Sequence, residues 1–202
     1  MTRRGFTLIE LMVTISIFVF MTALVLARYN SYNSGILLTN TAYDIALVIR
    51  QAQTYGVSVM TTSASSPNFS YPYGVEFRMN TSYFPLFIDT NSDGVYDVVG
   101  DGSVTTYHLQ QNALISNICI GNGSSCDSSS AGTVDITFKR PDPSAIIIAP
   151  NLNKTTTYNF VRLTIISGDK TSCRNIIVRQ SGQISVESDT TCYTGSTSST
   201  TY

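Results

Sequence analysis

The first 27 residues of the chain consist of a short basic start followed by a long apolar run. Arg3 and Arg4 precede the run, which extends from Phe6 to Ala27 and is interrupted only by one Glu and by a few Ser and Thr residues. These 22 residues would measure about 33 Å as an α-helix, enough to cross the hydrocarbon core of a bilayer. The pattern therefore predicts a transmembrane helix over residues 6–27.

A second helical pattern follows directly, over residues 28–58. Five apolar residues recur there at alternating spacings of four and three: Leu38, Ala42, Ile45, Ile49 and Ala52. This spacing places them on one face, so it predicts an amphipathic continuation of the helix that packs against another element. The segment 30–35 is rich in Asn and Ser and ends in Gly, residues that disfavour helix interiors. We expect a bend or a locally unwound segment there.

The pattern then changes to short β-type runs separated by turn residues, within a predicted head of residues 59–193. Eight strands are predicted: Tyr73–Met79, Tyr83–Ile88, Val104–Gln110, Leu114–Ile120, Val134–Lys139, Tyr158–Ile166, Arg174–Arg179 and Gln183–Glu187. Ser181-Gly182 predicts a hairpin turn between the last two. A Ser/Thr loop at 61–67 joins helix to strands, prolines at 141, 143 and 150 predict an irregular stretch, and residues 194–202 form a polar tail.

Composition limits the molecule to one head. About 175 residues follow the apolar run, enough for one core, and 43% hydrophobic residues argue against disorder. The formal net charge is −1, and only 12% of residues are charged. The basic residues are scattered apart from Lys139-Arg140, so no nucleic-acid site is indicated.

Glu10 is the residue with the most information about function. A charged group inside a transmembrane segment costs roughly 2.5–3.5 kcal/mol on insertion scales, so it is read as functional and as needing a partner. Residues 6–27 contain no Lys, Arg or His, so a second chain must supply the positive charge. An ordinary secretory signal and a plain membrane anchor are the alternatives, and neither accounts for an acid at this position.

The basic leader, Gly5, Phe6, the apolar residues after them and Glu10 resemble the signature of type IV pilin-like proteins, over residues 3–13. The resemblance implies that a prepilin peptidase removes leader residues 1–5 by cutting after Gly5 and N-methylates Phe6. It implies that Glu10 pairs with the N-terminal amine of a neighbouring subunit. It also implies an α+β pilin fold, in which the long helix packs on an antiparallel β-sheet head.

A finer resemblance is to the minor-pilin and pseudopilin H/FimT-FimU branch. Three segments carry it, in the expected order: Ile45–Ala52 with Val57, Phe87–Asn91, and Ile176–Ile184. The implied function is a structural subunit, a minor pilin or pseudopilin with a major pilin left open, of a type IV pilus or a type II secretion pseudopilus. The implied partners are other pilin subunits, the prepilin peptidase, an inner-membrane assembly platform and membrane lipid. The implied location is the inner membrane, then an extracellular or periplasmic filament.

A loop with alternating oxygen side chains follows the second predicted strand. Its candidate Ca²⁺ ligands are Asp89, Asn91, Asp93, the Val95 carbonyl, Asp97 and Asp101. The Asp-x-Asn-x-Asp-Gly start resembles an EF-hand loop, because Ca²⁺ prefers six to eight oxygens and the Gly permits a sharp turn. Position twelve is Gly100, so the bidentate Glu of an EF-hand is absent and Asp101 would substitute. The alternative is a polar turn in which Asp and Asn bond their own backbone.

Four cysteines lie in the exported part, and an even number there favours two disulfides. Three pairings are possible. We prefer Cys119–Cys126, which flank a Gly/Ser loop, and Cys173–Cys192, which flank the last predicted hairpin. Each would stabilise the fold by roughly 2–4 kcal/mol. Zinc is the competing interpretation, but the Cys-x-x-Cys spacing is missing.

The sequence predicts no enzyme. His108 is the single histidine and lies in an alternating strand pattern, and no nucleophile or phosphate-binding motif surrounds it. A different class of protein fits the 12 Tyr and many Ser, Thr and Asn residues. This alternative is a membrane-anchored or secreted adhesin that does not polymerise.

Overall fold

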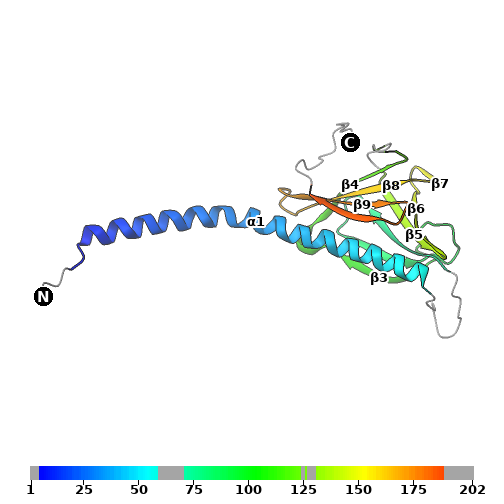
Figure 1. Ribbon diagram of the computed structural model, residues 1–202, viewed down its shortest axis with the longest axis horizontal. Coiled ribbons are helices and arrows are strands. Elements are labelled where there is room, and N and C mark those ends of the chain that lie inside the picture. The colour runs from blue at the N-terminus through cyan, green and yellow to red at the C-terminus, as the bar shows by residue number, and fades with distance from the viewer. Residues whose placement is uncertain (1–4, 59–70, 124–125, 127–130, 189–202) are drawn as a thin grey trace.

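The computed structural model describes residues 5–58, 71–123, 126 and 131–188 of the chain. Leader residues 1–4, the predicted loop at 61–67 and the predicted tail at 194–202 lie outside these ranges. Helix α1 (Leu8–Val57) is 50 residues long. Its first half projects from the rest of the molecule, and its second half lies along the β-strands (Figure 1).

The second half of α1 packs through the predicted apolar stripe. Leu38, Ala42, Ile45, Ile49 and Ala52 are at most 2% exposed and belong to the hydrophobic core. Of the bend or locally unwound segment expected at 30–35, the unwinding was wrong, because α1 is helical throughout; Figure 1 shows the helix curving gently. Gly costs about 1 kcal/mol in a helix and Asn less than about 0.7 kcal/mol, and the helical hydrogen bonds and the packing of the flanking turns outweigh these costs.

The strands form two antiparallel sheets. The first has the order β3-β2-β1-β5-β6-β7 and the second the order β10-β9-β8-β4. The first sheet comprises β1 (Tyr73–Arg78), β2 (Tyr83–Ile88), β3 (Gly102–His108), β5 (Thr133–Lys139), β6 (Asp142–Ala149) and β7 (Asn153–Thr157). The second comprises β4 (Leu114–Gly121), β8 (Phe160–Ile166), β9 (Cys173–Arg179) and β10 (Ile184–Ser188).

Helix α1 contacts strands of both sheets, namely β1, β5 and β6 of the first and β8, β9 and β10 of the second. The core therefore lies between the helix and the two sheets, and the predicted α+β arrangement of a helix on an antiparallel head is confirmed. Gly56 shows how close this packing is. A Cβ built there would lie 2.3 Å from the Phe138 carbonyl oxygen, so only glycine fits.

Two strands were missed by the sequence analysis. The stretch bracketed by Pro141 and Pro150, predicted to be irregular, forms β6 (Asp142–Ala149). The two prolines lie outside the strand, and Pro143 is exposed near its beginning, so the apolar end of β6 can still pair. Strand β7 joins the same edge. The predicted strand Val104–Gln110 starts earlier and ends at His108, and a short 3₁₀ turn, Gln110–Asn112, follows it.

The side of the first sheet that faces away from α1 is covered by a loop. Val134, Ile136 and Phe138 of β5 point into the core, so Asp135 and Thr137 point to the opposite face. The segment between β2 and β3, residues 89–101, lies over that face. Thr137 Oγ1 is 3.6 Å from the position that a Cβ at Gly94 would occupy. This segment, called the Asp loop below, contains the candidate Ca²⁺ ligands.

Candidate functional site

The candidate processing site precedes α1. Phe6 is 78% exposed. Thr7 is the N-cap residue and has extended backbone angles (φ −81°, ψ 148°), so α1 begins at the next residue, Leu8. The Glu10 backbone N–H donates to Thr7 Oγ1 at 3.4 Å, and the Thr7 hydroxyl donates to Glu10 Oε2 at 3.5 Å. The Thr7 N-cap thereby satisfies one of the free N–H groups at the start of the helix. Gly5 and Phe6 therefore lie outside the helix in an accessible segment.

The helix that carries Glu10 has an uncovered apolar surface. Leu8–Leu26 is long and apolar enough to cross a membrane, and none of it is buried inside the molecule. Side chains such as Phe18 and Leu26 are 71% and 67% exposed. A contiguous apolar surface of this size requires lipid or other helices around it. The expected membrane anchoring fits this finding.

Glu10 has no positively charged partner in its own segment. Residues 5–26 contain no Lys, Arg or His, and the one ion pair in the described part of the chain joins Arg78 to Glu76. The hydroxyl of Thr7 is therefore the partner that the described helix provides for this carboxylate. An acid on a lipid-exposed helix face with only a hydroxyl partner can still accept a strong hydrogen bond from a cation of another molecule.

Comparison with known proteins agrees with this geometry. Residues 1–26 match the family described as the prokaryotic N-terminal methylation motif. This motif is the signature of type IV pilins and their prepilin precursors, and the chain carries it. Proteins with this signature are structural subunits rather than enzymes, and they assemble with other pilin subunits after processing by the prepilin peptidase. No curated protein and no solved structure matches the chain.

The predicted Ca²⁺ ligands all lie in the Asp loop, where several bond to backbone amides. Asp89 Oδ2 accepts from Gly94 N at 2.9 Å, Asn91 Oδ1 from Asp93 N at 3.0 Å, and Asp93 Oδ1 from Val95 N at 2.9 Å. Gly94 adopts φ 81°, which suits glycine. These bonds are those of the polar turn that was the alternative to a metal loop.

Asp97 and Asp101 also accept hydrogen bonds from backbone amides of the loop. Asp101 Oδ1 accepts from Thr90 N at 2.9 Å and its Oδ2 accepts from Asp97 N at 2.8 Å, so this carboxylate joins the two ends of the loop. Asp97 Oδ1 accepts from Val99 N at 3.2 Å. Within the described residues, no three His, Cys, Asp or Glu side chains are grouped closely enough to hold a metal by themselves. Calcium binding stays a prediction.

Sequence reasoning missed the carboxylates beneath this loop. Asp135 and Glu76 face each other on β5 and β1, and they are 0% and 5% exposed. Burial, together with the neighbouring Glu76, raises the pKa of Asp135 to about 8, although the Tyr96 amide opposes the rise. Burial also raises the pKa of Glu76, against the opposing effect of Arg78. In sequence, both acids occupy positions that alternation assigns to a solvent-exposed face, so no local signal could reveal that a loop covers them.

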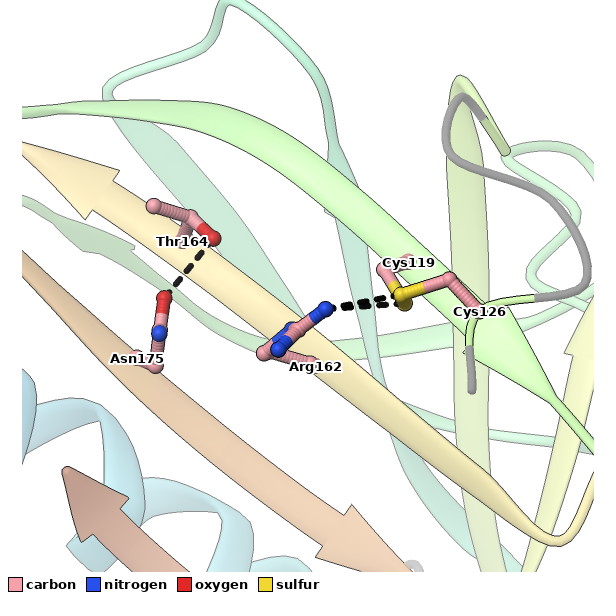
Figure 2. The surroundings of a disulfide bond; sticks show 5 residues. All are labelled: Cys119, Cys126, Arg162, Thr164 and Asn175. Carbon is pink, nitrogen blue, oxygen red and sulfur yellow. Dashed lines mark hydrogen bonds between the residues drawn. A yellow bond between two sulfur atoms is a disulfide. The ribbon is translucent and has the colours of Figure 1, made fainter. Parts of the chain in front are cut away.

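A disulfide joins Cys119 of β4 to Cys126, as predicted, with Cα atoms 5.6 Å apart. Figure 2 shows Arg162 of β8 pointing toward it, and Arg162 Nη2 lies 2.8 Å from Cys126 Sγ. Between β8 and β9, the Thr164 hydroxyl donates to Asn175 Oδ1 at 2.8 Å. Cys173 is buried at the start of β9. Its predicted partner, Cys192, lies outside the described residues.

His108 lies at the end of the edge strand β3 and is exposed. Its ring packs on Tyr83, with centroids 6.0 Å apart. This contact is that of an ordinary surface imidazole at a sheet edge.

Proposed function

We propose that the chain is a minor pilin or pseudopilin, processed after Gly5, N-methylated on Phe6 and assembled into a filament through Glu10. The observation that carries the proposal is a carboxylate on an uncovered apolar helix that supplies no cation for it. Cleavage after Gly5 would create an ammonium group on Phe6, at the membrane end of the same helix. A neighbouring chain presents that ammonium, and Glu10 neutralises it.

The proposed pairing is between chains for a structural reason. The Thr7 backbone is extended, so Phe6 does not continue the helix toward Glu10. The Glu10 carboxylate accepts a hydrogen bond from the Thr7 hydroxyl of its own chain. An ion pair formed in an apolar environment is strong, because little water competes with it. The same two charges left unpaired in lipid are costly, so the pair selects assembled helices in the correct register.

The finer branch is supported by the placement of its three segments. Ile45–Ala52 forms the part of α1 that packs in the core, and Phe87–Asn91 leads from β2 into the Asp loop. Ile176–Ile184 spans the β9–β10 hairpin, where the predicted turn at Gly182 is present with φ 82°. Members of this branch typically occupy the filament tip or start assembly.

Two variants at the helix start test the role of Glu10. Glu10→Gln removes the charge but retains the hydrogen-bonding shape, and Thr7→Val removes the cap but retains the charge. If the charge drives assembly, Glu10→Gln lowers the amount of chain in sheared filaments at least about tenfold, whereas Thr7→Val changes it by less than about threefold. Membrane levels of the chain, measured by immunoblotting, serve as the control for insertion.

The alternative function, a non-polymerising adhesin, predicts the opposite result. Such a protein needs no charge at position 10, so Glu10→Gln should insert at least as well and retain full surface function. Mass spectrometry of the mature N-terminus provides a separate test of processing. A chain that begins with N-methylated Phe6 agrees with the proposal, and one that begins at Met1 or Arg28 contradicts it.

A further inference from the structure

The disulfide between Cys119 and Cys126 lies on the outer face of the second sheet, beside an arginine. Cys119 of β4 and Arg162 of β8 are direct partners in the antiparallel register, so their side chains stand side by side on one face. The residues that flank these two along their strands belong to the hydrophobic core: Ile118, Ile120, Val161 and Leu163. Side chains alternate along a strand, so Cys119 and Arg162 point away from the core.

The Arg162 guanidinium is directed at the sulfurs. Its Nη2 lies 2.8 Å from Cys126 Sγ and 3.6 Å from Cys119 Sγ (Figure 2). Among the residues that the structure describes, the one ion pair joins Arg78 to Glu76, so none of their carboxylates neutralises Arg162. A guanidinium forms its strongest hydrogen bonds with anions, whereas a disulfide sulfur is neutral and a weak acceptor. The same contacts would be much stronger if the sulfurs were thiolates.

The two sulfurs differ in their access to solvent. Cys119 is 1% exposed and is held within β4, whereas Cys126 is half-buried and lies outside the strands. In thiol–disulfide exchange a thiolate attacks one sulfur and the other leaves as a thiolate. Cys126 Sγ is therefore the sulfur that an attacking thiolate can reach, and Cys119 Sγ is the one that leaves. A nearby cation stabilises a thiolate and so favours this step.

We propose that the Cys119–Cys126 disulfide is an exchange site that a dithiol reduces, with Arg162 stabilising the thiolates that form. One thiolate of the dithiol bonds to Cys126 Sγ, the Cys119–Cys126 bond breaks, and its electron pair leaves on Cys119 Sγ. The second thiolate of the dithiol then attacks the sulfur bonded to Cys126, closes the disulfide of the dithiol and releases Cys126 as a thiolate. The two cysteines gain two electrons, the dithiol loses them, and its two protons pass to solvent or to the cysteine sulfurs.

The test uses the full oxidised chain in detergent micelles, without denaturant. Dithiothreitol and reduced thioredoxin are the two dithiol probes, and free thiols are alkylated at timed intervals and counted at each cysteine by peptide mass spectrometry. We expect Cys119 and Cys126 to become alkylated while the chain stays folded, and Arg162→Gln to slow their reduction at least about fivefold. The probe that reacts faster at equal concentration shows whether a small or a protein dithiol is the better reductant.

Matched variants separate the charge of Arg162 from its packing. Arg162→Lys retains the charge, and Arg179→Gln removes a charge from an exposed position of the neighbouring strand β9, so each should change the rate by less than about threefold. Loss of packing alone would expose the disulfide and speed its reduction, the opposite of the expected result. In glutathione buffers, Arg162→Gln should lower the equilibrium constant for reduction about tenfold, or about 30 mV for a two-electron couple.

A measurement on the wild type covers the case in which Arg162→Gln does not fold. Brief exposure to reduced glutathione should leave glutathione on Cys126 and a free thiol on Cys119, because Cys126 is the accessible sulfur.

Four results would overturn the proposal. The first is a disulfide that stays oxidised until the chain unfolds, and the second is glutathione on Cys119 instead of Cys126. The third is reduction of Arg162→Gln at the wild-type rate or faster. The fourth is equal slowing in Arg179→Gln and Arg162→Gln, which would indicate a general effect of net charge. None of these outcomes depends on filament assembly.

Discussion

Two glycines in α1 illustrate how strongly one residue's surroundings decide its role. A Cβ at Gly56 would meet the Phe138 carbonyl at 2.3 Å, whereas a Cβ at Gly35 would have only Ser172 Oγ at 3.6 Å, an ordinary contact. Backbone atoms cannot move aside as a flexible side chain can. The close approach of helix and sheet at Gly56 is thus maintained by the absence of a single methyl group.

We predict opposite effects of the same substitution at these glycines. Gly56→Ala should lower the free energy of unfolding by about 2 kcal/mol or more, because helix and strand must separate. Gly35→Ala should raise it by about 0.5–1 kcal/mol, because Ala is the better helix former. Chemical denaturation of the two variants measures both changes. Equal effects at the two positions would contradict the packing argument.

Single residues also differ in how far sequence alone can interpret them. Glu10 was identifiable because its context is local, an acid within an apolar run beside Gly5-Phe6. Asp135 was not, because its burial depends on the Asp loop, which lies some 40 residues earlier in the chain and folds over β5. The environment of such a side chain is a property of the tertiary fold.

At the scale of elements, β4 is fastened by a covalent link near its end. Cys119 and Cys126 are seven residues apart, and Arg162 of the neighbouring β8 contacts the sulfurs. We predict that the double variant Cys119→Ser/Cys126→Ser loses about 2–3 kcal/mol of stability, the chain-entropy value for so short a loop. Chemical denaturation under oxidising conditions measures the loss.

A control for this prediction lies on the same strand. Ser116 Oγ donates to the Thr164 carbonyl at 3.0 Å, so Ser116→Ala removes one β4–β8 hydrogen bond and leaves the disulfide intact. Its expected cost is about 1 kcal/mol. If the double cysteine variant costs no more than Ser116→Ala, the disulfide contributes little beyond local contacts.

Elements with strong periodicity were predictable, and elements with mixed signals were not. The stripe from Leu38 to Ala52 defined the buried face of α1, and a glycine turn defined the β9–β10 hairpin. Strand β6 was missed because its prolines indicate irregular backbone, whereas its apolar residues 145–148 pair with β5. Residues 30–35 are poor helix formers, and they remain helical because the long helices on both sides of them are stable.

The whole molecule separates two kinds of surface. The first half of α1 is uncovered and apolar, whereas the second half buries one face against the two sheets, and Figure 1 shows the two parts as a stalk and a head. The head therefore has its own core and can vary on its outer face without disturbing the helix surface. The Asp loop and the acids below it lie on that outer face.

Those acids should make the stability of the whole head depend on pH when metal is absent. The pKa of Asp135 is about 8 in the folded state, against an ordinary value of 3.8 when unfolded. Between these values the folded chain binds one more proton than the unfolded chain, so stability is greatest at low pH and falls as pH rises toward 8. In chelator, the wild type should therefore lose on the order of a few kcal/mol between pH 5 and pH 8.

Asp135→Asn isolates this contribution, because Asn carries no titrating proton. The variant should have a flatter dependence of unfolding free energy on pH and should exceed the metal-free wild type in stability at pH 8, where the wild type must bury a charge. Denaturation curves at several pH values, all in chelator, provide the comparison. Parallel pH profiles for the two chains would mean that Asp135 titrates normally and that the layer beneath the Asp loop is hydrated.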